Sequence, residues 1–239
     1  MRPYLSVTTA GGVAIALSVA ILLALPSADA HAQPQPSPHF RLPFDTPPGF
    51  STWYVIQFYG NTGYAYANRN ALYVQSQGLH SGVDFGAPCG TQVVAIGDGT
   101  VVEVDNPAFG LAPHELTIRH PQGYLSFYGH LLEKPRLGIG AQVRASQPIA
   151  LTGDPDGTCH SRPHLHLEIR DLTYRNAYNP VTLIDADWNT LALFGSYQPD
   201  FETNVDSPRQ WVSPAGQPDL RFNGPLVNDY AHPWPPAGW

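Results

Sequence analysis

Two short motifs that contain histidine supply the residues that could do chemistry in this chain. The first, His80-Ser-Gly-Val-Asp84, offers an imidazole and a carboxylate, and the second, His164-Leu-His166, offers two imidazoles. Catalytic zinc sites take three protein ligands from His and Asp or Glu and leave the fourth position for water. Each motif alone is a weak signal, but together they predict a metal site that activates water.

Both motifs fit extended strands. The polar residues His164, His166 and Glu168 alternate with leucines, and because the side-chain period of a strand is two, they project from one face. His80 and Asp84 are also an even number of positions apart and can share a face. The alternation does not say which histidine of the pair binds metal. Glu168 is either a residue that orients a site histidine or a surface residue.

A further histidine, His130, ends the strand-like segment Phe127-Tyr128-Gly129. One ion does not need five ligands, so His130 and one member of the histidine pair are available for proton transfer. The remaining histidines lie in a linker, beside turns or in the tail. His160 is close to the second motif, and we expect it to be a solvent-facing loop residue.

The elements that must position these residues are β-strands. The 22 glycines and 25 prolines are spread along the chain, and after residue 30 no stretch offers three turns of amphipathic helix. The turn sequences at 97–99 and 121–123 predict hairpins. An antiparallel, mainly β domain follows, with strands expected over 53–58, 82–85, 92–96, 99–104, 116–120, 125–130 and 165–170.

The pattern along the chain predicts four regions. Residues 1–30 have the apolar core and small-residue site of an export signal, and the apolar run is too short to favour a membrane anchor. Residues 31–48 are a Pro-rich linker, 49–185 the metal-binding domain and 186–239 an irregular extension rich in Trp and Pro. Aromatic residues of the extension either cover a core edge or bind sugar rings. We expect a monomer that is secreted or associated with the cell envelope.

Charge and cysteine content narrow the function further. The net charge is −7 and the 12 Lys and Arg residues are scattered, which argues against nucleic acid as a partner. In an oxidising compartment, the only two cysteines, Cys89 and Cys159, are expected to form a disulfide that ties the two motifs together and contributes about 4 kcal/mol. Buried free thiols are the alternative. A thiolate on zinc would fill the position that catalysis needs.

The motifs resemble the signature of the lysostaphin and LytM-like zinc metallopeptidases, which cut peptide cross-links in bacterial cell walls. The resemblance spans roughly residues 49–180 and rests on the two motifs, on Tyr128-Gly-His130, and on the strand and turn segments at 81–85, 90–95, 97–101 and 147–153. Cys159 and His160 stand where that family often has small hydroxyl-rich residues. This departure concerns substrate fit at that loop and leaves the metal set intact.

The resemblance implies a compact antiparallel β-sheet domain of the duplicated hybrid, barrel-sandwich-like kind, with a groove over one Zn²⁺. It implies zinc ligands His80, Asp84 and His166, catalytic histidines His130 and His164, and a candidate for transition-state stabilisation, Tyr73. The implied function is an exported endopeptidase that hydrolyses peptide bonds of peptidoglycan cross-links through a zinc-bound water, without stable membrane insertion once the signal is removed.

Two other functions remain open at this stage. A non-catalytic, peptidoglycan-binding regulator of wall hydrolysis could use the same domain. Two histidines and one carboxylate also form the facial triad of non-haem iron oxygenases. That chemistry has no use for the extra pair, His130 and His164, and the full ligand set disfavours a regulator.

Overall fold

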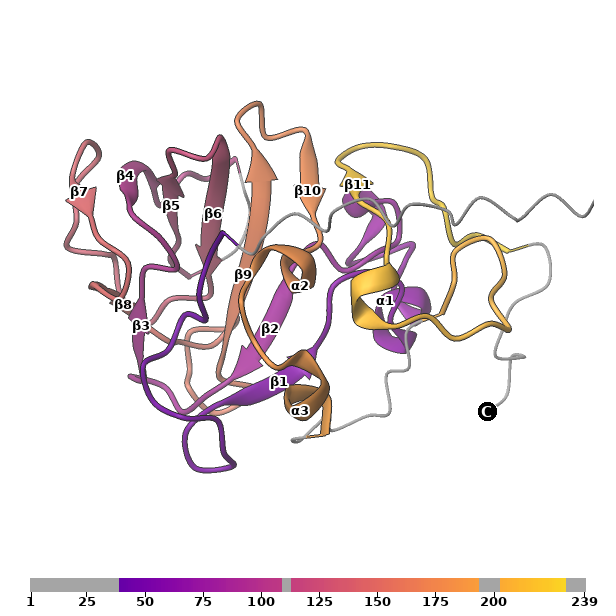
Figure 1. The fold of residues 1–239 in the computed structure, drawn as a ribbon, viewed down its shortest axis with the longest axis horizontal. Coiled ribbons are helices and arrows are strands. Elements are labelled where there is room, and N and C mark those ends of the chain that lie inside the picture. Colours follow the sequence, from indigo (N-terminus) through magenta and orange to yellow (C-terminus); the bar gives the residue numbers. More distant parts are fainter. Residues whose placement is uncertain (1–38, 109–112, 194–202, 231–239) are drawn as a thin grey trace, which may run out of the picture. The chain divides into compact units, whose positions relative to one another are not determined.

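The computed structural model describes residues 39–108, 113–193 and 203–230. The predicted export signal and residues 31–38 of the predicted linker lie outside these ranges. The described part is mostly antiparallel β-sheet with a few short helices, which confirms the predicted fold class (Figure 1). Among the described residues, none of the helices is long and apolar enough to cross a membrane. The elements, in chain order, are β1 (Tyr54–Gln57), α1 (Gly63–Ala67), η1 (Val74–Ser76), β2 (Val83–Gly86), β3 (Gln92–Val94), β4 (Gly99–Val104), β5 (Leu116–Arg119), β6 (Tyr124–Gly129), β7 (Gln142–Val143), β8 (Pro148–Leu151), β9 (His164–Asp171), β10 (Asn176–Tyr178), α2 (Pro180–Leu183), α3 (Trp188–Leu193), η2 (Pro214–Gly216) and β11 (Leu220–Arg221).

Each predicted strand overlaps a strand of the structure, but only one of the two predicted hairpins forms. The turn at 121–123 joins the antiparallel pair β5 and β6, and Gly123 adopts a left-handed φ of 88° there. The turn at 97–99 does not make a hairpin, because β3 pairs with β8 while β4 pairs with β5 and β7. Turn residues specify where the chain reverses and do not choose the partner of the next strand.

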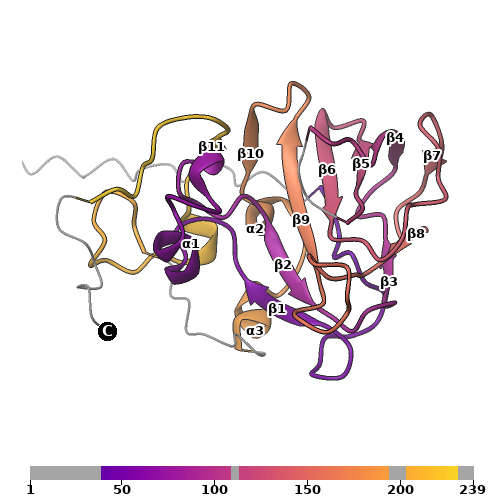
Figure 2. The ribbon, with the colours of Figure 1, turned by 180° about the vertical axis from the view of Figure 1, so that it is seen from behind.

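The long strand β9 positions the two motifs. The main sheet has the order β1-β2-β9-β6-β5-β4-β7, so β9 lies between β2 and β6, and all of these pairs are antiparallel (Figures 1 and 2). In this register Asp84 of β2 and Gly129 of β6 both lie opposite His166. The segments that carry the three motifs therefore meet at one end of β9.

The apolar residues of β9 belong to the core. Leu165 and Leu167 are fully buried in a cluster that also contains Val181 and Leu183 of α2. This helix lies in front of β9 in Figure 1 and behind it in Figure 2, so it covers one face of the sheet. Because side chains alternate along a strand, the histidines of β9 project from the opposite face, as predicted.

The packed domain begins before the predicted boundary at residue 49. Phe40 and Phe44 are 4% and 3% exposed, and both belong to the core cluster. The backbone N–H of Phe40 donates to the Leu183 carbonyl, and the Phe44 ring stacks on Trp53 at 5.1 Å between centroids. Local composition indicates an extended chain here, but it does not show that two phenylalanines fill an edge of a distant core.

The described part of the C-terminal extension packs against the 59–78 segment. Strand β11 pairs with β10, and the yellow segment lies beside the loops around α1 in both views (Figures 1 and 2). The fully buried Asn228 donates from Nδ2 to Asn61 Oδ1 at 2.9 Å and to the Gly78 carbonyl at 2.7 Å. Residues 203–230 thus cover an edge of the domain.

Candidate metal centre and substrate groove

Three side chains converge on one point beside β9. His80 Nε2 lies 3.2 Å from both His166 Nδ1 and Asp84 Oδ1, and the last two atoms are 2.7 Å apart. All three residues are buried, and their candidate ligand atoms lie within 4.8 Å of one another. The fixed register of β2 against β9 creates this cluster, because it places Asp84 directly opposite His166.

The outer nitrogens of both histidines are already occupied, which is the arrangement that a metal site requires. His80 Nδ1 donates to the Phe58 carbonyl at 2.7 Å, so its Nε2 presents a lone pair to the cluster. His166 Nε2 donates to Glu168 Oε1 at 2.9 Å, so its Nδ1 faces inward. Around tetrahedral zinc, ligand atoms lie about 3.3 Å apart. The two nitrogen atoms fit this spacing, and the N and O donors suit zinc.

Gly82 lets the first motif approach β9. An ideal Cβ at this position would lie 2.4 Å from the Leu167 carbonyl oxygen, a distance that no side chain tolerates. A residue without a side chain is therefore required between His80 and Asp84, where the chain passes against β9.

Buried charges in the cluster compensate one another. Burial would raise the pKa of Asp84, but the facing His80, His164 and His166 lower it well below its ordinary value. Burial would likewise raise the pKa of Glu168, but the adjacent Arg170 and His166 lower it to about 2. Glu168 also accepts a hydrogen bond from the Ser81 hydroxyl at 2.8 Å. It is thus a charged partner of His166, one of the two readings that the sequence left open.

The other two predicted site residues lie beside this cluster. His164 Nδ1 donates to the Arg162 carbonyl at 2.7 Å, and its Nε2 lies 3.8 Å from Asp84 Oδ2. His130 follows β6 with a left-handed φ of 56°, and its ring centroid lies 4.8 Å from that of His164 and 6.0 Å from that of His166. All five predicted residues are therefore neighbours. Their division into ligands and catalytic histidines stays a prediction.

A cavity of about 1160 Å³ opens over the five residues. The 59–78 segment, expected to form a groove wall, contributes Tyr64 and Tyr73 to its lining. The Tyr73 ring meets the His80 ring edge-on at 5.8 Å, and its hydroxyl donates to Gln57 Oε1 at 3.2 Å. Burial raises the pKa of Tyr73, so the phenol stays protonated at neutral pH.

The lining residues that the sequence analysis did not identify include Arg162, Phe222 and Asn223. Arg162 stands two positions before His164, and this proximity to a motif was a usable signal. Phe222 and Asn223 come from the extension, where no periodicity or motif marks them. Only the pairing of β11 with β10 brings them to the groove.

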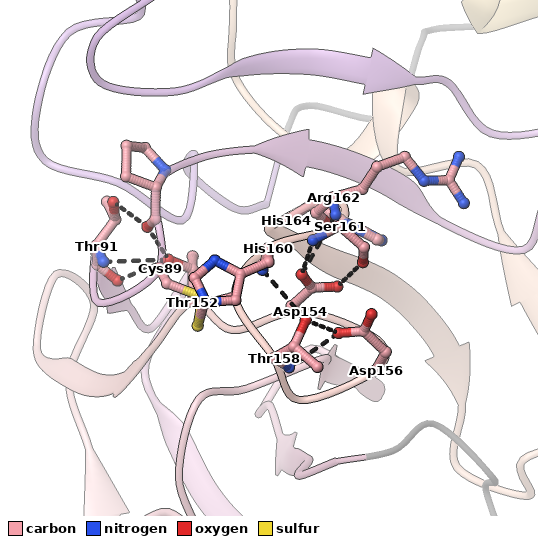
Figure 3. Close-up of a disulfide and its surroundings, with 12 residues drawn as sticks. Cys89, Thr91, Thr152, Asp154, Asp156, Thr158, His160, Ser161, Arg162 and His164 are labelled. Carbon is pink, nitrogen blue, oxygen red and sulfur yellow. Dashed lines mark hydrogen bonds between the residues drawn. A yellow bond between two sulfur atoms is a disulfide. The ribbon is translucent and has the colours of Figure 1, made fainter.

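The predicted disulfide between Cys89 and Cys159 is confirmed, and it belongs to the loop that leads into β9 (Figure 3). The Asp154 carboxylate in this loop is fully buried and accepts from the Ser161 hydroxyl at 2.6 Å and from the backbone N–H groups of Ser161 and Arg162. His160 is exposed, as expected. The loop before His164 is therefore fastened both by a covalent bond and by a carboxylate.

Comparison with known proteins agrees with the motifs. Residues 78–180 match peptidase family M23. The murein hydrolase activator EnvC of Escherichia coli strain K12 is 38% identical over 104 residues, which are 43% of this chain and 23% of the relative. The peptidoglycan DD-endopeptidase ShyC of Vibrio cholerae is 34% identical over 89 residues, 37% of this chain and 19% of the relative. The matched segment thus spans less than a quarter of either relative.

Among solved structures, a zinc-containing peptidase from Vibrio cholerae is 27% identical, with a TM-score of 0.44, and the match covers 62% of this chain and 40% of that chain. The match to peptidase family M23 confirms the resemblance noted from the motifs, at the level of the family. Residues 78–180, the segment that carries both histidine motifs, match peptidase family M23.

Proposed function

We propose that this chain is an exported, zinc-dependent endopeptidase that hydrolyses peptide bonds in the cross-links of bacterial peptidoglycan. One relative is named as an activator of murein hydrolases and another as an endopeptidase, so the relatives alone do not choose between the two roles. The observation that supports an enzyme is the complete cluster: three converging donor atoms with two further histidines beside them. A binding protein has no need for the second pair.

His80, Asp84 and His166 would hold the zinc, because their donor atoms converge and their outer atoms are already hydrogen-bonded. A zinc ion supplies Lewis acidity that lowers the pKa of a water molecule and polarises the scissile carbonyl. Glu168 holds the His166 ring in place, and Arg170 and Ser81 in turn hold Glu168.

His164 is suited to accept the proton of the attacking water. Its Nδ1–H donates to a carbonyl, so Nε2 carries the lone pair and faces the metal-binding side chains. His130, only partly buried at the groove, would in its protonated form stabilise the oxyanion or deliver a proton to the leaving amine. Both steps use the side chains as the fold already orients them.

This function requires the protein to reach the wall. The predicted signal at residues 1–30 would provide export, and the enzyme would act as a monomer in the cell envelope or outside the cell. The groove beside the cluster would take the wall peptide.

Digestion of purified peptidoglycan tests the proposal. The zinc-loaded protein should create new peptide termini, identified by mass spectrometry, and a chelator should abolish them until zinc is restored. Thiol reagents should have no effect, and metal analysis should find zinc rather than iron. The Asp84→Ala variant serves as the inactive control.

The regulator remains the second candidate because of the 38% identity to an activator. A zinc-loaded protein that binds the wall, stimulates a separate hydrolase and creates no termini of its own would favour the regulator and contradict the enzyme.

A further inference from the structure

Arg162 places an exposed cation at the groove. Its side chain is exposed, lines the cavity of the five-residue cluster and extends away from the disulfide in Figure 3. The other arginine of the lining, Arg170, is buried and paired with Glu168. Within the described ranges, Arg162 has no carboxylate within ion-pair distance, in contrast to Arg41, Arg69, Arg136 and Arg170.

The backbone of Arg162 is held on both sides. Its N–H donates to Asp154 Oδ2 at 3.3 Å, and its carbonyl accepts from His164 Nδ1 at 2.7 Å. The disulfide at Cys159 anchors the same loop three residues earlier. The guanidinium carbon lies 5.5 Å from the centre of the Tyr64 ring, and the Arg162 side chain is hydrogen-bonded to Tyr64, another lining residue. A cation that is already positioned loses little conformational entropy when it binds a ligand.

A guanidinium presents paired N–H donors that match a carboxylate, and such charge-assisted pairs are strong and directional. Arg162 is two residues from His164 and its carbonyl orients that ring, so a group bound to its side chain would lie close to the reacting amide. On the basis of the proposed peptidase function, we infer that Arg162 is a specificity-determining residue that binds a substrate carboxylate within one or two residues of the scissile bond.

This assignment names a class of substrate. Cross-links through diaminopimelate carry a carboxylate beside the amide, whereas oligoglycine bridges carry none near the bond that is cut. The structure therefore favours acidic wall peptides over neutral bridges as the substrate of this groove.

Matched peptides test the inference. One carries a carboxylate beside the scissile amide and the other a carboxamide at the same place. Each is made in a cleavable form for kinetics and with a methyleneamine in place of the amide for binding calorimetry. The proteins are wild type, Arg162→Ala, Arg162→Lys and Arg136→Ala, all zinc-loaded. Arg136 is an arginine outside the groove lining with a side chain that is 90% exposed.

Wild type should bind the carboxylate peptide about tenfold to a hundredfold more tightly than the carboxamide. Arg162→Ala should remove this preference and raise KM for the carboxylate peptide with little change in kcat. Arg162→Lys should keep part of the preference, and Arg136→Ala all of it. Unfolding and metal content should be unchanged in the variants, which separates lost recognition from lost folding.

The inference would be overturned if the wild-type protein bound neither peptide or bound both with equal affinity. It would also be overturned if Arg162→Ala still bound the carboxylate peptide more tightly. The binding readout separates this inference from the proposed function. Tighter binding of the carboxylate peptide without any cleavage would support the role of Arg162 in recognition and contradict the proposed peptidase function. Equal cleavage of both peptides would contradict the role of Arg162 in recognition and support the proposed peptidase function.

Discussion

Two buried glutamates, one in β9 and one beside β5, have pKa values that are shifted in opposite directions. Glu168 in β9 is 1% exposed, and Glu115, immediately before β5, is 3% exposed. Burial by itself would raise the pKa of both carboxyl groups. The pKa of Glu168 is nevertheless lowered to about 2, while that of Glu115 is raised to about 7. Depth in the fold therefore does not decide the charge of these groups.

The difference lies in their partners. Glu168 contacts Arg170, His166 and the Ser81 hydroxyl, so its negative charge is compensated. At Glu115 burial prevails: the Asn106 N–H donates to the carboxyl group at 2.8 Å and Arg170 also favours its ionisation, but the nearby Asp105 and Glu103 oppose it. The metal-site region thus keeps its buried groups charged by pairing them, whereas the β4–β5 region favours a protonated carboxyl.

The largest expected effect on activity comes from removal of a metal-binding side chain. Asp84→Ala and His80→Ala should each abolish metal retention and lower hydrolysis by at least about 10³-fold, because three protein ligands are needed to hold a catalytic ion. Metal analysis and wall digestion measure both effects. Asp105→Ala is the matched control, since Asp105 also pairs with a histidine, His114 at 2.9 Å, but in the other region. One equivalent of zinc retained by Asp84→Ala would contradict the assignment.

His130→Ala should separate metal binding from chemistry within the same region. We expect the variant to keep its zinc and to lose about 10²–10⁴-fold in kcat, the range typical of a lost acid or base. The exposed His160 provides the control, because His160→Ala should change neither quantity. Full activity in His130→Ala would remove this residue from the mechanism.

Glu168→Gln tests the pairing of the buried carboxylate with Arg170 and His166. The amide keeps the shape of the side chain but removes the carboxylate that pairs with the buried Arg170, so we expect a loss of about 3–5 kcal/mol in the free energy of unfolding. Metal affinity should fall by about 10–100-fold, because His166 loses its charged partner. Urea unfolding and competition with a zinc chelator measure the two effects.

The pH dependence of stability tests whether Glu168 is charged in the folded protein. A depressed folded-state pKa contributes stability above the unfolded value of about 4.5, and this contribution is lost as the pH falls towards 2. Wild type should therefore lose more stability than Glu168→Gln over that interval. Equal losses in the two proteins would show that the pair with Arg170 is not charged.

Glu115→Gln should have the smallest effect and the opposite sign. A raised folded-state pKa contributes stability that is present below about 4.5 and is lost as the pH rises through 7. The variant should match wild type at pH 4 and exceed it at pH 8 by on the order of 1 kcal/mol, after allowance for solvent screening. Thermal unfolding at the two pH values is the measurement, and destabilisation at pH 8 would contradict the comparison.

Much of the site could be predicted because its signals are local. The alternation in His164-Leu-His166-Leu-Glu168 depends only on the side-chain period of a strand, and the structure places these polar side chains on one face. The partner Arg170 extends the same alternation and could have been found with it. In contrast, composition does not show that the packed domain includes Phe40 and Phe44, because their partners lie in other segments: Phe40 bonds to Leu183, and Phe44 packs on Trp53 and Phe85.

The amino-acid sequence by itself determined which side chains can bind metal, which of them share a strand face, and where the chain turns, since these properties depend on residue type and neighbouring positions. Only the tertiary structure decided that Asp84 lies opposite His166, that Arg162 and Phe222 line one cavity, and that the pKa of Glu168 is lowered while that of Glu115 is raised. Strand register, cavity lining and compensation of buried charge all arise from contacts between distant segments, which no local pattern records.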